Sequence, residues 1–187
     1  MELNKEEVAV RQLDTAICLL FDGGDVVSIH TLACAAANVL RDVLNARGGE
    51  TWQDAIIKTH PGMEREVHQT LARAQNFFKH ADRDAEEELN FDESTNDETI
   101  FVATLEYCDL LRIGAPSKPT KITTPMSVFQ FWYFAKASRG LLATPDDSGV
   151  EIAKAASRLF PGLAKVPRVE QLAQGAKVLK VWRDREL

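Results

Sequence analysis

Apolar residues recur at intervals of three and four positions along most of the chain, and this spacing collects them on one face of an α-helix. The clearest examples are Val10, Leu13, Ile17 and Leu20 in residues 4–22, and Ile29, Ala33, Ala36, Leu40 and Val43 in residues 25–46. Glycine pairs at 23–24 and 48–49 end these two segments, which predicts an antiparallel helical hairpin. Alternation typical of strands nowhere extends beyond a few residues, so the chain is predicted to be all-α.

The same spacing, together with capping patterns and helix-breaking prolines and glycines, predicts the remaining helices. They are expected at 52–58 after a Thr51/Asp54 capping pair, 61–81, 95–112 after a Thr95/Glu98 capping box, 125–138, 148–160, and from about 167 onwards. The fold class is thus an up-and-down bundle of about six to eight helices. We expect one domain over 1–187, although the proline-containing segment 115–124 would allow a division into 1–114 and 125–187.

Composition narrows the class of protein further. The chain has 187 residues, of which 45% are apolar and 27% charged, as expected of a soluble domain with a sizeable core. Its first residues are charged where a signal peptide needs an apolar run, and no uninterrupted apolar stretch reaches a membrane span, so we expect a cytoplasmic protein without a membrane segment. The three cysteines are unclustered, which favours reduced thiols. No sequence motif indicates a metal site or a cofactor.

The charge of the chain is unevenly distributed. Residues 82–98 contain nine acidic residues and one arginine, whereas the net charge of the whole chain is only -6. We predict a solvated loop over most of this acid-rich stretch. A nucleic-acid-binding protein usually has a basic surface, so the net charge argues against RNA. Because the acids are concentrated in one segment, RNA remains a possible partner beside a protein.

The candidate functional residues lie in the predicted helix 61–81. Arg73, Asn76 and His80 follow one another at intervals of three and four, so a helix would point them in the same direction. Lys79 lies beside them, and Asp84 follows the helix. The side expected to face the core carries Val67, Leu71, Ala74, Phe78 and Ala81. The polar residues should therefore border a concave pocket that solvent can reach.

His30 in the second helix has two readings. It lies beside the apolar face, where a satisfied, partly buried histidine is the usual case. If the second helix packs against helix 61–81, His30 becomes a second histidine of the pocket.

The spacing of Arg73 and His80 resembles the R-x4-6-H motif of the HEPN superfamily of all-helical domains, many of which are metal-independent ribonucleases of toxin and defence systems. The resemblance implies that His80 acts as general acid or base on the ribose 2′-hydroxyl or the leaving oxygen. It implies that Arg73 holds the phosphate, assisted by Asn76 or Lys79. The family often has a polar residue directly after the arginine, whereas this chain has Ala74.

Two alternatives stay open beside catalysis. In the first, Arg73 and His80 pair with acids such as Asp84 and stabilise the C-terminal end of the helix. The whole chain would then be a non-catalytic module that binds a protein partner or a second copy of itself. A homodimer is expected in either case, because the segment 125–138 is apolar around its whole circumference and HEPN-like domains commonly pair through their motif helices.

Overall fold

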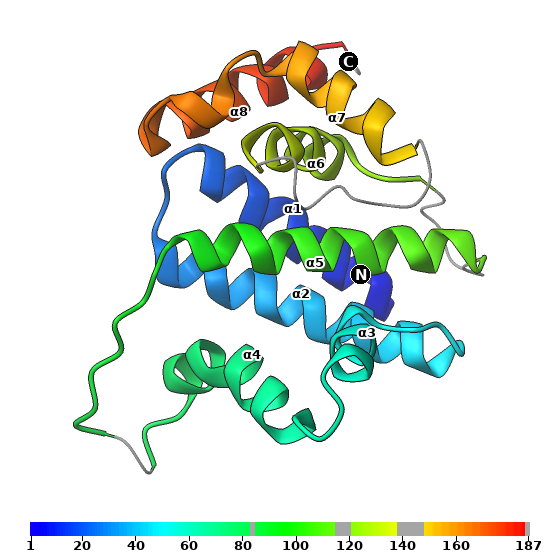
Figure 1. Cartoon of the computed structure of the whole chain (residues 1–187), viewed down its shortest axis with the longest axis vertical. Coiled ribbons are helices and arrows are strands. Elements are labelled where there is room, and N and C mark those ends of the chain that lie inside the picture. The colour runs from blue at the N-terminus through cyan, green and yellow to red at the C-terminus, as the bar shows by residue number, and fades with distance from the viewer. Residues whose placement is uncertain (83–84, 115–120, 138–147, 186–187) are drawn as a thin grey trace. The chain divides into compact units, whose positions relative to one another are not determined.

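The computed structural model describes residues 1–82, 85–114, 121–137 and 148–185, except for the side chains of 148–150. These residues form eight α-helices and one short 3-10 helix, η2, and contain no strand, which confirms the all-α prediction (Figure 1). The elements are α1 (Lys5–Phe21), α2 (Val26–Ala46), α3 (Trp52–Thr59), α4 (Glu64–Lys79), α5 (Ser94–Arg112), α6 (Thr124–Lys136), α7 (Ser148–Leu159), η2 (Leu163–Lys165) and α8 (Arg168–Arg183).

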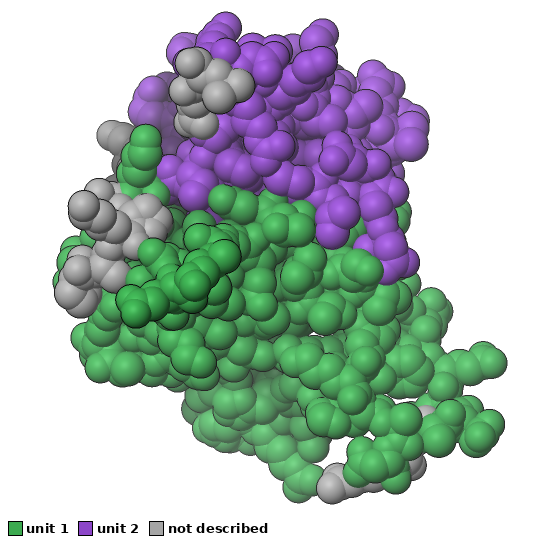
Figure 2. Space-filling model, turned by 180° about the vertical axis from the view of Figure 1, so that it is seen from behind, with its two compact units in different colours: residues 1–16, 26–121 green, residues 17–25, 122–187 purple. Residues whose placement is uncertain are grey.

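The chain divides into two compact units, which Figure 2 colours separately. Unit 1 comprises Met1–Ala16 and Val26–Lys121, and unit 2 comprises Ile17–Asp25 and Ile122–Leu187. The boundary after Lys121 falls inside the proline-containing segment 115–124. The assignment of residues 17–25 to unit 2 has no counterpart in the sequence pattern, since the last turn of α1 continues the same apolar spacing as the rest of that helix.

Unit 1 is built around the contact of α2 with α5, which run side by side (Figure 1). The buried apolar residues of this contact are Ile29, Ala33, Ala36, Leu40 and Leu44 of α2, and Ile100, Phe101, Ala103, Tyr107 and Leu110 of α5. Burying one large apolar side chain stabilises a fold by about 1.5–3 kcal/mol, so this contact dominates the stability of the unit. The predicted face of the second helix is correct except at its end, where Leu44 is buried and Val43 is only half-buried.

By length and composition alone, α2 is also apolar enough to cross a membrane. The core helix of a soluble protein passes the same test. In unit 1, α2 buries the polar residue His30 and carries the charged residues Arg41 and Asp42 before its last turn.

Unit 2 surrounds the aromatic helix α6 with α7, η2 and α8. Phe129 and Trp132 are fully buried, and the edge of the Phe21 ring meets Trp132 at 5.5 Å between centroids. The indole Nε1 of Trp132 donates a hydrogen bond to the backbone oxygen of Gln171 at 2.8 Å. Phe131, on another side of α6, packs against Trp182 of α8. Phe129 and Trp132 are therefore covered within the unit, whereas Phe131 and Phe134 are half-buried.

A glycine allows the closest approach of α8 to the end of α1 inside unit 2. A Cβ atom at Gly175 would lie 2.3 Å from Cε1 of Phe21, well inside van der Waals distance. Phe21 is itself buried against Phe129 and Trp132, so its ring has little room to move. Any side chain at position 175 therefore forces α8 away from the aromatic core.

We expect Gly175→Ala to lower the free energy of unfolding by about 1–3 kcal/mol, because overpacking outweighs the gain in helix propensity of about 1 kcal/mol. Urea unfolding followed by tryptophan fluorescence measures the change, since Trp132 and Trp182 both belong to unit 2. The exposed Lys177→Ala on the same helix is the control and should unfold within about 0.5 kcal/mol of wild type. An unchanged or raised midpoint for Gly175→Ala would contradict this packing.

Candidate functional site

The helix that carries the candidate residues, α4, is shorter than predicted. It begins at Glu64 rather than Pro61, because Gly62 adopts a left-handed conformation with φ of 86° and turns the chain before the helix. It ends at Lys79, and His80 follows as an extended capping residue with φ of -130° and ψ of 133°. The backbone N–H of His80 still donates to the Asn76 oxygen at 3.0 Å, so His80 stays within one turn of Asn76.

The core-facing side predicted for this helix is wrong. Leu71 is 52% exposed, Ala81 lies beyond the helix and is exposed, and Val67, Ala74 and Phe78 are only half-buried. The one buried residue of α4 is polar, Gln75. The reason is that α4 meets α2 through a hydrogen bond of Asn38 with Gln75 as well as through the ring contact of Phe78 with His30, so apolar residues alone do not select its inward face.

The outward face of α4, as we call the side formed by Arg73, Asn76 and His80, is open to solvent. All three residues are exposed, and Lys79 at the edge of this face is exposed as well. Within the described part of the chain, the side chains of Arg73, Asn76 and His80 form no hydrogen bond or ion pair. Asp84, the acid predicted to lie near them, is outside the described residues.

The inward face of α4 meets α2 and α3 through a chain of polar contacts, which we call the polar seam. The side chains in it are His30, Cys34, Asn38 and Arg41 of α2, Gln53 of α3, and His68, Gln75, Phe78 and Lys79 of α4. Asn38 Nδ2 donates to Gln75 Oε1 at 3.2 Å, and Arg41 donates from Nη2 to Asn38 Oδ1 at 2.7 Å. Arg41 also donates from Nη1 to Gln53 Oε1 at 2.9 Å. Gln53 in turn contacts His68, so the chain of contacts returns to α4.

His30 occupies the end of the polar seam near α5 and is only 2% exposed. Asn96 Nδ2 donates to the Val26 oxygen at 3.0 Å, which leaves Asn96 Oδ1 to face His30 Nδ1 at 2.9 Å. An amide oxygen only accepts, so His30 Nδ1 carries the proton and, in the neutral ring, Nε2 is the acceptor. Burial lowers the pKa of His30, which favours this neutral form. Of the two readings, the satisfied buried histidine therefore describes His30 better.

Cys34 completes a Cys-His-Asn arrangement without the properties of a nucleophile. Its Sγ lies 3.3 Å from His30 Nε2, the position from which a thiol donates to the ring. Burial raises the pKa of the Cys34 thiol to about 11, while the nearby charges of Lys79 and Arg41 lower it. The reactive form of cysteine is the thiolate, so a thiol of this pKa is unreactive at neutral pH. The three residues act as a buried polar link between α2 and α5.

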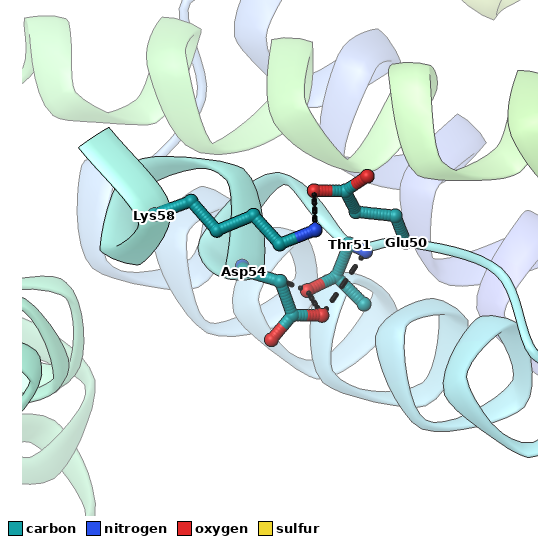
Figure 3. A network of polar contacts seen from close by, with 4 residues as sticks. All are labelled: Glu50, Thr51, Asp54 and Lys58. Carbon is teal, nitrogen blue, oxygen red and sulfur yellow. Dashed lines mark hydrogen bonds and ion pairs between the residues drawn. The ribbon is translucent and has the colours of Figure 1, made fainter. Parts of the chain in front are cut away.

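The start of α3 is fixed by the predicted capping pair (Figure 3). Thr51 Oγ1 accepts from the Asp54 backbone N–H at 3.1 Å, and Asp54 Oδ2 accepts from the Thr51 N–H at 3.2 Å. Beside it, Lys58 pairs with Glu50 at 2.8 Å. Each carboxylate drawn in Figure 3 is thus engaged in holding this helix.

Glu106 of α5 lies beside the same helix start and was not singled out by the sequence. It is 3% exposed, its carboxylate accepts a backbone hydrogen bond from Trp52, and its Oε2 has no hydrogen-bond partner. Burial raises the pKa of Glu106 to about 7, against the opposing effect of Arg41. The sequence does not reveal that Glu106 is buried, because its burial depends on where α3 packs against α5.

A cleft of about 480 Å³ lies between the start of α3 and α5. Its walls are mainly apolar, with Leu44, Trp52, Ala55, Leu105 and Ile113 among the lining residues. None of the residues predicted to form a site lines this cleft. Among the described residues, no group of three or more histidine, cysteine or acidic side chains is arranged to hold a metal ion.

No protein-family model, curated protein sequence or solved structure matches this chain. The resemblance to HEPN domains therefore depends only on the spacing of Arg73 and His80 and on the all-helical fold.

The burial of Glu106 predicts a pH-dependent stability. The folded chain binds more protons than the unfolded chain between the ordinary glutamate pKa of 4.5 and about 7. The free energy of unfolding should fall by roughly 1–3 kcal/mol as the pH rises through this range. Glu106→Gln keeps an acceptor for Trp52 but does not titrate, so it should remove this part of the pH dependence.

Urea unfolding of both proteins at several pH values between about 5 and 8 measures the effect. Glu98→Gln, an exposed glutamate on the same helix, is the control and should leave the profile unchanged. Identical pH profiles for wild type and Glu106→Gln would show that this carboxyl group titrates normally.

Proposed function

We propose that the protein is a helical binding module that contacts an acidic partner segment through the outward face of α4. The observation that supports this proposal is the simultaneous exposure of Arg73, Asn76 and His80, none of which bonds to another described residue. A cation that serves only to stabilise a helix is commonly paired, whereas these groups remain available to a partner. The inward face of the same helix packs against α2 and α3, so the outward face is the side of α4 that is open to a macromolecular partner.

Charge complementarity indicates the class of partner. Residues 71–80 contain two formal cations and no acid, whereas the acid-rich stretch that follows has a strong negative charge. Of its described acids, Asp82, Glu86, Glu87 and Glu88 are exposed, whereas Asp97 is buried. A second copy of the chain offers this stretch to the first copy's α4, and a two-fold arrangement would form each contact twice. We therefore propose a homodimer in which outward face and acid-rich stretch meet.

The proposal predicts a dimer that depends on charge. Sedimentation at micromolar concentration and low salt should give about twice the chain mass of 20.8 kDa. Arg73→Glu should shift the protein to monomer, and Glu87→Lys in the same chain should partly restore the dimer. Salt near 0.5 M should dissociate wild type, because exposed charges are then screened within about 4–5 Å.

The control is Arg112→Glu, which reverses an exposed arginine elsewhere in unit 1. It should leave the dimer intact. A wild-type monomer at low salt, or a dimer that Arg73→Glu does not weaken, would contradict the proposed contact.

Metal-independent RNA cleavage is the second candidate function. The observation in its favour is that His80, although outside α4, lies within one turn of Asn76 and is exposed together with Arg73. In this reaction Arg73 would hold the phosphate, and His80 would transfer the proton to or from the ribose or leaving oxygen. The open surface around them favours binding over catalysis, because catalysis gains from groups held in a water-excluding site.

RNA degradation in the presence of a chelator tests this candidate. Arg73→Ala and His80→Ala should each lose activity while their unfolding free energies stay within about 0.5 kcal/mol of wild type, since both side chains are exposed. His60→Ala is a matched control, because His60 is likewise an exposed histidine directly after a helix. Full activity in both variants, or activity that requires an added divalent metal, would exclude this mechanism.

A further inference from the structure

The polar seam contains more hydrogen-bond donors than acceptors. Arg41 has five N–H donors, and its hydrogen bonds go to the neutral amide oxygens of Gln53 and Asn38. No described carboxylate lies within ion-pair distance of Arg41. Gln75 is 9% exposed, its Oε1 accepts from Asn38, and its Nε2 is buried without a partner. The guanidinium of Arg41 and the buried amide of Gln75 are therefore separated only by the Asn38 side chain. Both have N–H donors that no described group accepts.

Lys79 of α4 adds a second cation to the donors of Arg41 and Gln75. Lys79 follows Gln75 by four residues, so it lies one turn further along the same helix. The positive charges of Lys79 and Arg41 both lower the pKa of the Cys34 thiol, and Cys34 lies one turn before Asn38 on α2. Lys79 also forms no ion pair with a described residue.

Two acidic residues feel the charge of Arg41, but their carboxylates bind groups at the start of α3. The positive charge of Arg41 lowers the pKa of Glu106 and that of Asp54. However, the Glu106 carboxylate accepts from the Trp52 backbone, and Asp54 closes the capping box with Thr51. Both acids hold the start of α3 and cannot turn to the seam without releasing that helix. The local positive charge is thus not neutralised by a hydrogen-bonded carboxylate among the described residues.

We infer that the polar seam between α2 and α4 is a binding site for a phosphate group, with Arg41, Gln75 Nε2 and Lys79 as the donors. A guanidinium fork, a neutral amide N–H and an ammonium group together offer only donors, which suits a tetrahedral oxyanion with several acceptor oxygens. A buried donor without a partner destabilises the fold, and a bound phosphate oxygen would accept its hydrogen bond. Gln75 lies on the inward side of α4 and Lys79 at the edge of the outward face, and the site uses neither Arg73 nor His80, so it does not depend on the function proposed for them.

Two sources supply the same phosphate chemistry, a free phosphate or small phosphate ester and the backbone of a nucleic acid. Proton–nitrogen NMR of the full-length protein distinguishes them by following the side-chain amide signal of Gln75, which Gln75→Leu assigns by its disappearance. One series adds inorganic phosphate, a second adds a short single-stranded RNA, and a third adds sodium chloride at matched ionic strength. A saturable shift of the Gln75 signal with phosphate or RNA, but not with chloride, is the expected result. The series with the lower midpoint identifies the source.

Lys79→Gln should weaken the phosphate response by about fivefold or more, the effect of losing one charge-assisted hydrogen bond. Lys58→Gln is the matched control, because Lys58 is also an exposed lysine in the last turn of its helix. It should leave the midpoint unchanged. A Gln75 signal that neither phosphate nor RNA moves would overturn the inference and leave an ordinary solvated seam. Equal midpoints for Lys79→Gln and wild type would also overturn it.

Discussion

The two-sided packing of α2 is the constraint on which unit 1 depends. One side of this helix is apolar and buried against α5, where each large side chain contributes on the order of 1.5–3 kcal/mol. The other side is polar and meets α4 through hydrogen bonds, each with a net contribution of only about 0.5–1.5 kcal/mol. His30 joins the two sides, because its ring bonds to Asn96 of α5 and packs against Phe78 of α4. The core of the unit and the placement of α4 are thus connected through one buried imidazole.

This difference in energy explains why α4 carries the candidate surfaces. A helix held mainly by a polar contact keeps most of its circumference exposed, and only Gln75 of α4 is buried. Residues on such a helix are not required for the core, so they are available for binding without a loss of stability. Local opening also occurs most readily where few apolar contacts are made. By contrast, the aromatic helix α6 is enclosed within unit 2 and offers no comparable surface.

The sequence predicted the helical class and most helix positions, because apolar spacing and glycine turns are local signals. The capping pair Thr51/Asp54 is correct for the same reason. The predicted Thr95/Glu98 capping box is not formed, since α5 begins one residue earlier, at Ser94, without a side-chain cap. The inward face of α4 was predicted wrongly because apolar spacing cannot reveal a polar contact such as Asn38 with Gln75, which are 37 residues apart. Arg73 and His80 are exposed to solvent, whereas the concave pocket expected beside them stays a prediction, and the contacts of the seam could not be found without the fold.

The buried titratable residues His30 and Glu106 change the stability of unit 1 in opposite directions as the pH changes. Burial lowers the pKa of His30, so the folded chain disfavours the charged ring, and stability is lost as the pH falls below the ordinary histidine value of 6.5. Burial raises the pKa of Glu106, so its effect has the opposite sign between 4.5 and about 7. The two groups act on different helices, since His30 contacts Phe78 of α4 and Glu106 accepts from the start of α3. A protonated His30 would also add a third positive charge to those of Lys79 and Arg41, the cations that act on the adjacent Cys34. A fall in pH below 6.5 therefore weakens the packing of His30 against α4, whereas a rise in pH from 4.5 to about 7 weakens the support that Glu106 gives to the start of α3.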